Sequence, residues 1–478
     1  MRPSDREVAG KITRRGAITT PLCVFVPPLR TDPASGPRRE FRHGRRVLRG
    51  AVPGLRDHRG QSRRVPHPTA ALPPMTSLAW LMVPLAMIGI VRVCVVLVAA
   101  DLYDLSLHRS RPLPYEPSVW VVIPAYNEEL CVARAVRSVL DSSYLDVSVI
   151  VVDDGSTDGT VACLQGFGSR VRVVSQPNSG KAAAINTGMR LVGDGLVMVL
   201  DADSSLSRSA VSRMVAHFAD PIVLAAAANV KIAGPRGVLG WVQRLEYAVV
   251  HRLKQGYTVF NCEYVIGGVG SMFRTSVVRA CGSFDTDTMT EDIDFSMKIL
   301  TLRGNYDWRI IFAADAIAYT QAVPSLHGLL RQRSRWKFGR LQAFYKHRSL
   351  FFGTTCSRLL SWVHLPYTAA GEVLVLFEPL FVYVVVSATF QTGWFTGILL
   401  LCAVYTGVAV FTVVGDLTEP WRAKVQLLAL APLAYPLLMV IVFVDLVAVL
   451  RSLLTVLRGY RPVGRWEHVE RTLTSVPG

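Results

Sequence analysis

The stretch "VIVVDDGSTDGT", residues 149–160, decides the fold of this chain. Its leading β-branched residues predict a buried strand, and the aspartates, glycine and hydroxyl residues after them predict a turn. Asp153 and Asp154 stand side by side, and because like charges repel, they require water or a cation. A plain turn explains the stretch taken alone, since Asp and Gly are common turn residues. The sequence around it favours a binding site.

Strands and helices alternate on both sides of this stretch. The other expected strands are 118–129, 171–178 and 195–206, and the expected helices are 130–144, 159–168 and 181–192. This alternation predicts an α/β fold in which a mostly parallel sheet has helices on both faces. Ligands of such sheets bind beyond the carboxyl ends of the strands. The polar strand ends "PAYNEE", "DDGSTD" and "DADSS" are therefore expected at one edge of the sheet.

The common nucleotide loops do not account for this edge. "QPNSGKAAA" has a Gly-Lys pair but lacks the earlier glycine and the following Ser or Thr of a nucleotide-triphosphate loop. "DDGSTDGT" lacks the G-x-G-x-x-G of a dinucleotide fold. Further along, "VIGGVGSMFRTSVV" (265–278) supplies glycines that let the backbone approach a ligand closely. We therefore expect a ligand of another class.

An acidic segment follows at 282–304. It contains Asp285, Asp287, Glu291, Asp292 and Asp294. Helix capping is the simplest explanation of Glu291 and Asp292, with Thr290 as the N-cap and the acids at the positive end of the helix dipole. That explanation leaves room for a chemical role as well.

A basic segment follows at 329–344, "LLRQRSRWKFGRLQAF". It contains Arg331, Arg333, Arg335, Lys337 and Arg340 among leucine and aromatic residues. A basic amphipathic helix on an anionic membrane face is the simpler explanation of this pattern.

Hydropathy indicates a membrane protein. Hydrophobic residues make up 51% of the 478 residues, and the mean hydropathy is +0.33. Four apolar runs, at 78–100, 372–390, 394–414 and 425–450, each approach the ~20 residues that a helix needs to cross a ~30 Å hydrocarbon core. We expect one span before the soluble region and about three after it. The scattered cysteines, with no C-x-x-C pair, fit a reducing cytosolic domain without zinc.

The first 74 residues differ in composition from the rest. They carry 16 of the 52 Lys and Arg residues but only 5 of the 35 Asp and Glu residues. Rich in Pro, Arg and Gly, they are expected to be disordered. No aromatic interleaving or binding fold accompanies their charge, so no nucleic-acid partner is expected. A start at Met75 would remove this basic extension from the outer side of the first span, where positive charge is disfavoured.

Seven motifs in register resemble those of the family 2 glycosyltransferases, in particular the processive membrane polysaccharide synthases. They are "IPAYNEE", "VVDDGSTDGT", "GKAAAINTG", "VLDADS", "GGVGSMFR", "MTEDIDFSMKI" and "QRSRW", which together run from about residue 119 to 342. The resemblance is strongest to poly-N-acetylglucosamine synthases, with hyaluronan, chitin and cellulose synthases more distant. It implies a GT-A type domain that binds a nucleotide sugar and is inserted between transmembrane helices.

The resemblance also implies a role for each site residue. The residues expected to bind the donor nucleotide sugar are Pro124, Tyr126, Glu128, Asp153, Asp154, Lys181 and Asp201. Asp201 and Asp203 form the D-x-D that would hold Mg²⁺ or Mn²⁺ against the diphosphate, and strand alternation is expected to put both on one face. The polysaccharide or lipid-linked acceptor is assigned to Gly268, Gln332, Arg333 and Trp336.

The catalytic group is expected to be Asp292, Glu291, Arg335 and Trp336. Asp292 would act as the general base on the acceptor hydroxyl, with Glu291 beside it. Arg335 would steady the leaving diphosphate, and Trp336 would stack on a sugar ring. No second carboxylate is evident as a nucleophile, so direct displacement with inversion is expected, as in the family.

The expected domain organisation follows from these parts. It comprises a disordered extension (1–74), a transmembrane helix (75–100), a cytosolic GT-A domain (101–320), interfacial amphipathic helices with the Gln-x-x-Arg-Trp motif (321–365), a transmembrane region of about three helices (366–457) and a tail (458–478). Nucleotide sugars are cytosolic, so the catalytic domain is expected there. Three later spans would leave an arginine-rich tail outside, against the positive-inside preference, and Pro432 and Pro436 leave open a re-entrant or interfacial last run.

Two rival functions remain open from sequence. A transferase that loads one sugar onto a polyprenyl phosphate fits the sheet and the D-x-D, but does not by itself call for Gln332–Trp336. A nucleotide-sensing scaffold or transporter is disfavoured, because the apolar runs carry few ionisable residues, namely Arg92, Glu372, Glu378 and Asp445. The resemblance also leaves open a small membrane partner subunit.

Overall fold

The computed structural model describes residues 76–109, 115–235, 237–302, 308–392 and 395–458. The expected N-terminal extension and nearly all of the expected C-terminal tail lie outside these ranges. Everything described below belongs to one compact unit of the chain.

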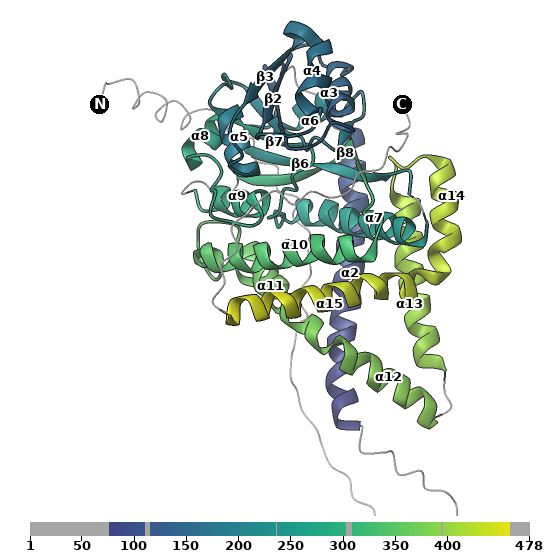
Figure 1. The fold of residues 1–478 in the computed structure, drawn as a ribbon. Coiled ribbons are helices and arrows are strands. Elements are labelled where there is room, and N and C mark those ends of the chain that lie inside the picture. Colours follow the sequence, from purple (N-terminus) through teal and green to yellow (C-terminus); the bar gives the residue numbers. More distant parts are fainter. Residues whose placement is uncertain (1–75, 110–114, 236, 303–307, 393–394, 459–478) are drawn as a thin grey trace, which may run out of the picture. The chain divides into compact units, whose positions relative to one another are not determined.

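The region between the apolar helices, here called the sheet domain, is built on one eight-stranded sheet with the order β3-β2-β1-β4-β7-β6-β8-β5 (Figure 1). The strands are β1 (Val119–Ala125), β2 (Val147–Asp153), β3 (Val171–Ser175), β4 (Leu196–Val199), β5 (Ser205–Leu206), β6 (Val223–Ala233), β7 (Ser271–Arg274) and β8 (Arg309–Gln321). The first four pair in parallel, as the alternation predicted. The sheet is nevertheless mixed, because β7 runs antiparallel to β4 and β6, and β5 runs antiparallel to β8.

Helices cover both faces of this sheet, which confirms the expected fold class. Its first helices are α3 (Val132–Leu140), α4 (Thr160–Leu164), α5 (Lys181–Met189), α6 (Ala210–His217), α7 (Gly237–Val259), α8 (Thr275–Cys281) and α9 (Glu291–Leu300). One buried cluster packs α3 and α6 on the face that Val121 and Ile123 occupy. A second cluster packs α5, α8 and α9 against Val122 and Ile150. Alternate side chains of β1 therefore pack into two hydrophobic layers, one on each face of the sheet.

Apolar helices flank the sheet domain in sequence. They are α2 (Thr76–Arg109), α11 (Leu365–Leu374), α12 (Glu378–Thr392), α13 (Thr396–Gly415), α14 (Trp421–Leu430) and α15 (Ala434–Leu457). Within the described residues, three helical stretches are long and apolar enough to cross a membrane: Leu360–Ser387, Thr396–Gly415 and Trp421–Leu457. These match the three later apolar runs. Helix α2 contains the first apolar run, 78–100, and its crossing of a membrane stays a prediction.

Helix α10 (Leu326–Lys346) lies between the sheet and the apolar helices (Figure 1). It spans most of the basic segment and carries the Gln-x-x-Arg-Trp motif, and its seating at a membrane surface stays a prediction. Its Ser325 N-cap accepts a hydrogen bond from the Gly328 amide at 3.1 Å. Helix α15 packs along α10, and Lys337 of α10 forms an ion pair with Asp445 of α15 at 3.0 Å.

Ion pairs hold the turn between α13 and α14 against the sheet domain. Lys231 of β6 forms ion pairs with Asp416 and with Glu419, the second at 3.1 Å. Arg244 of α7 also pairs with Glu419. All four side chains are largely buried, so this turn is fixed against the sheet domain.

Candidate active site

The loops after β1 and β2 are joined by hydrogen bonds. Asn127, which adopts a positive φ of 54°, accepts a bond from the Thr157 amide at 2.8 Å through its side-chain oxygen. The Glu128 amide donates to the Thr160 hydroxyl at 2.8 Å. Pro124 lies in β1, and Tyr126 and Glu128 follow it on this loop. The polar ends of the two strands therefore form one surface, as the parallel sheet requires.

The two aspartates of the opening stretch have different surroundings. Asp153 ends β2 and accepts a bond from the Ser156 amide at 3.1 Å. Asp154 is fully buried, and its carboxylate accepts bonds from the amides of Ser179 (3.0 Å) and Gly180 (2.8 Å) and from the side chain of Gln176 (2.7 Å). Asp154 thus shapes the loop that leads into α5. The nucleotide contacts expected of both residues stay predictions.

Lys181 joins two carboxylates that are far apart in sequence. It is the first residue of α5, and its ammonium lies 2.7 Å from Asp201 and 2.8 Å from Glu291. Burial would lower the pKa of Lys181, but these two carboxylates raise it above its usual value. Gly268 faces the pair: a Cβ there would lie 2.9 Å from the Lys181 ammonium. Gly268, the second glycine of the "GGVG" motif, therefore leaves room for this ion pair.

Asp201 and Asp203, the expected D-x-D, lie on the turn after β4, which ends at Val199. The expected reason for their alignment, alternation within a strand, is therefore wrong, although they are close enough for Asp203 to raise the pKa of Asp201, after the larger effect of burial. Among the described residues no three His, Cys, Asp or Glu side chains gather as a metal site. Two carboxylates suffice for Mg²⁺ or Mn²⁺ when a diphosphate supplies further oxygens, so the residues fit such an ion.

Asp292 stands in the first turn of α9, next to Glu291. Burial and the Glu291 carboxylate raise the pKa of Asp292 to about 6. For Glu291, burial would raise the pKa, but Lys181 holds it below the usual value, and Arg335 adds to this effect. Thr290 is the N-cap residue as expected, but its side chain makes no capping bond. The two neighbouring acids therefore have opposite pKa shifts, which is the pattern of an acid–base site.

The Gln-x-x-Arg-Trp residues do not all face this group. Arg335 is near enough to Glu291 to help lower the pKa of that carboxylate, after Lys181. Arg333 is buried, pairs with Glu246 of α7 at 2.5 Å, and lies 4.8 Å from the centre of the Trp336 ring. Arg333 is thus already in an ion pair with a protein carboxylate. The acceptor-binding roles of Gln332, Arg333, Trp336 and Gly268 stay predictions.

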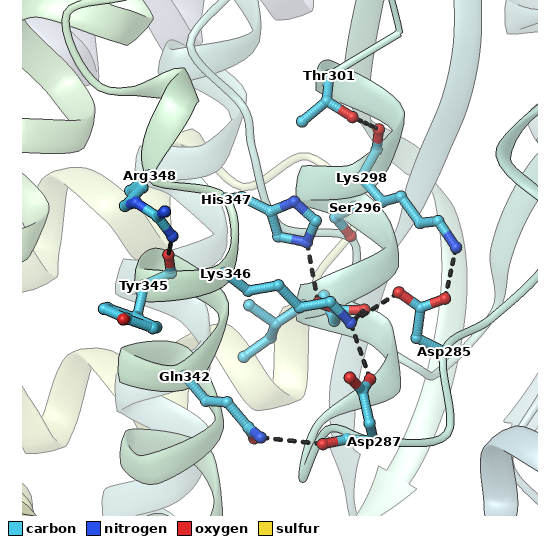
Figure 2. Close-up of polar contacts among 12 residues, drawn as sticks. Asp285, Asp287, Ser296, Lys298, Thr301, Gln342, Tyr345, Lys346, His347 and Arg348 are labelled. Atoms are coloured by element: carbon cyan, nitrogen blue, oxygen red, sulfur yellow. Dashed lines mark hydrogen bonds and ion pairs between the residues drawn. The ribbon is translucent and has the colours of Figure 1, made fainter.

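Four residues near the site escaped the sequence analysis. They lie on α10 and just after it: Gly339, Gln342, Lys346 and His347. Their spacing from Arg335 is the signal that was available, because positions 335, 339, 342 and 346 recur at the four- and three-residue steps of one helix face. Figure 2 shows Gln342 and Lys346 directed at the loop before α9, whereas His347 bonds to Asp294 within α9.

The comparisons with known proteins agree with this geometry. Residues 120–282 match the family model described as Glycosyl transferase family 2. The chain is 33% identical over 223 residues to the poly-beta-1,6-N-acetyl-D-glucosamine synthase of Staphylococcus aureus (strain COL), across 46% of this chain and 53% of that protein. The synthase of the same name from Staphylococcus epidermidis is 30% identical over the same length. The chain thus matches about half the length of these curated relatives.

A solved structure shares the fold. A mannosyltransferase from Pyrobaculum calidifontis, in complex with GDP-Man and Mn²⁺, superposes with a TM-score of 0.50 and 20% identity, over 77% of this chain and 97% of that one. This likeness supports the GT-A type sheet. The family match leads to one identification: residues 120–282 form a domain of the family 2 glycosyltransferase type.

Proposed function

We propose that the protein is a membrane-bound inverting glycosyltransferase that adds sugars from a nucleotide-diphosphate sugar to a growing polysaccharide. The observation that carries this proposal is the Lys181 ammonium between Asp201 and Glu291, with Asp292 beside them. The donor is a UDP-sugar, with UDP-N-acetylglucosamine first, because the relatives quoted above are named for that sugar's polymer.

Asp292 acts as the general base. The acceptor hydroxyl oxygen attacks the anomeric carbon from the face opposite the diphosphate, and its proton passes to the Asp292 carboxylate. The new C–O bond forms as the bond to the diphosphate breaks, and the diphosphate leaves with the electron pair. A pKa of about 6 leaves Asp292 ionised at neutral pH and makes it a stronger base than an ordinary aspartate.

The remaining residues of the site bind and orient. Mg²⁺ or Mn²⁺, held by Asp201 and Asp203, would neutralise the charge of the donor diphosphate. Lys181 and Arg335 add positive charge on the same side. Trp336 provides an aromatic face near the apolar helices, where a polymer passing toward the membrane stacks between additions. The catalytic domain faces the cytosol, where nucleotide sugars are made.

A panel of labelled nucleotide sugars tests the proposal. Membranes that contain the protein are incubated with each sugar, with and without a chelator, and the product is sized. We expect incorporation from a UDP-sugar into long chains, lost on chelation. Absence of transfer and of donor hydrolysis with every sugar contradicts the enzyme assignment. A product that is one sugar on a lipid moves the assignment to a polyprenyl-phosphate transferase.

Trp336→Ala tests whether the enzyme is processive. If the indole holds the nascent chain, the variant makes shorter product or mainly hydrolyses the donor, while nucleotide binding is kept. Trp336→Phe is the matched control, because it keeps an aromatic face. A Trp336→Ala enzyme whose long-chain distribution is unchanged, per amount of protein, contradicts the stacking role.

A further inference from the structure

Three acidic residues around the catalytic turn have no part in the proposed reaction. Asp285 and Asp287 lie on the loop before α9, and Asp294 lies two residues after Asp292. All three carboxylates meet the C-terminal end of α10 (Figure 2). We call the group formed by these aspartates with Gln342, Lys346 and His347 the α9 anchor.

Lys346 is the centre of the α9 anchor. Its ammonium lies 2.7 Å from Asp285, 2.8 Å from Asp287 and 3.3 Å from Asp294. The Lys346 side chain is 28% exposed and that of Asp294 is 0% exposed. Lys298 of α9 adds a second cation, 2.5 Å from Asp285. One lysine therefore joins the loop before the catalytic turn to the helix after it.

Two neighbours of Lys346 hold the same segment. The His347 ring nitrogen lies 2.9 Å from the Asp294 carboxylate. The Gln342 side chain donates to the Asp287 carbonyl at 3.0 Å and accepts from the Met289 amide at 3.0 Å. These bonds fix the backbone of the loop itself, so the α9 anchor restrains more than the tips of three side chains.

Close packing brings α10 to the N-cap of α9. A Cβ at Gly339 would overlap the Thr290 side chain, so α10 approaches the residue before Glu291 only because position 339 is a glycine. Gly339, Gln342 and Lys346 share the helix face of Arg335. The same face of α10 thus reaches the catalytic turn at Glu291 and clamps the segment around it.

We propose that the α9 anchor positions the general base, and that Lys346 is a positioning residue for Asp292. This inference rests on the proposed function, since it takes Asp292 as the base. Asp292 lies between two restrained points: the loop bonded to Gln342 and Lys346, and Asp294 bonded to Lys346 and His347. Proton transfer requires the carboxylate within hydrogen-bond reach of the acceptor hydroxyl, and a misplacement of about 1 Å costs up to ~10²-fold in rate.

The test compares Lys346→Met with Lys346→Arg in membranes. Methionine keeps the stem and removes the charge, whereas arginine can still bridge several carboxylates. We expect Lys346→Met to lower kcat by about 10-fold or more with the donor KM within about 2-fold, because the donor site is untouched. Lys346→Arg should recover most of kcat. Equal kcat for wild type and Lys346→Met contradicts the positioning role.

Arg348→Met is the matched control. Arg348 lies two residues further on, and its described contacts are with Tyr345: the carbonyl at 3.3 Å and the ring face at 5.3 Å from the centroid. The Arg348→Met substitution removes one cation from the same segment and leaves the contacts of the α9 anchor in place. The kcat should therefore not change. A loss in Arg348→Met equal to that in Lys346→Met shows a general effect of charge and overturns the assignment.

Hydrogen exchange supplies a readout that does not depend on activity. In Lys346→Met, amides of residues 285–294 should exchange faster, while those of β1 and β2 keep their wild-type rates. Faster exchange throughout the sheet means that Lys346 acts on global stability, and contradicts a local role. If the wild type transfers no sugar yet exchange rises at 285–294 alone, the proposed function fails and the α9 anchor stands as a structural clamp only.

Discussion

Helix α10 has two faces that contact different parts of the molecule. The face with Arg335, Gly339, Gln342 and Lys346 meets the catalytic turn, where the carboxylates belong to α9 and to the loop before it. The face about 160° away carries Arg333, Lys337 and Arg340, which pair with Glu246 of α7, Glu372 of α11 and Asp445 of α15. Trp336 lies between the two faces.

The difference between the faces lies in burial. On the face toward the apolar helices, the side chains of Glu372 and Arg333 are 4% and 9% exposed. On the catalytic face, exposure varies from 72% for the side chain of Asp287 and 29% for that of Asp285 to 0% for that of Asp294. When a buried ion pair is broken, the remaining charge has no water around it. At an exposed ion pair, solvent compensates for part of the lost interaction. We therefore expect the catalytic face to control turnover, and the buried face to control stability.

The largest effect is expected at the catalytic turn. Asp292→Asn keeps the shape of the side chain but removes the base, so kcat should fall by ~10²–10⁴-fold. Donor affinity should be nearly unchanged. Asp203→Asn is the contrasting variant, because it should weaken metal-dependent donor binding instead. Sugar transfer and nucleotide binding measured on both variants separate the two roles, and near-normal synthesis by Asp292→Asn means that the proton goes elsewhere.

On the buried face, Arg333→Met should act on stability. It leaves Glu246 buried without its 2.5 Å partner, and loss of one member of such a pair costs about 3–5 kcal/mol. Arg331→Met, an exposed position on the same helix, is the control for thermal unfolding in detergent. If Arg333 binds acceptor instead, as its motif implied, the acceptor KM rises while the unfolding temperature stays at that of Arg331→Met.

The pH dependence of the reaction is a smaller effect. A base works in its ionised form, and burial with the Glu291 carboxylate raises the pKa of Asp292 to about 6. Transfer should therefore be constant above about pH 7 and fall by about tenfold per pH unit below pH 6. Initial rates between pH 5 and 8 measure this limb. A flat wild-type profile across that range counts against Asp292 as the titrating group.

The smallest effect is expected at an exposed pair outside α10. Arg279 forms an ion pair with Asp194, and their side chains are 56% and 93% exposed. Arg279→Ala should change the unfolding free energy by no more than about 1 kcal/mol. Thermal unfolding beside Arg333→Met gives this reference. A loss as large as that of Arg333→Met would show that burial does not set the scale.

Sequence patterns predicted the fold well because the hydrophobic periods are local. The apolar runs at β1 and β2 and the helix at α5 follow directly from the alternation of side chains. The antiparallel entry of β7 escaped prediction, since its four residues pair with strands distant in sequence. The motifs led to Lys181, Asp201 and Glu291. Their meeting at 2.7 and 2.8 Å could not be predicted, because a helix start, a turn and another helix bring them together.

The packing of α15 along α10 bears on how many times the chain crosses a membrane. Helix α15 is apolar enough for a span, yet Asp445 and Ser452 contact Lys337 and Ser334 of a helix too rich in cations to enter lipid. The turn at Asp416 is bound to Lys231, which places the end of α13 beside the catalytic domain. Helix α14 has 10 residues and a length of only about 15 Å, which is too short to cross the hydrocarbon core. We expect α15 to lie along the membrane surface, so the crossings after the catalytic domain number two instead of three. An even number returns Arg458 to the side of the catalytic domain, where the positive-inside preference favours it.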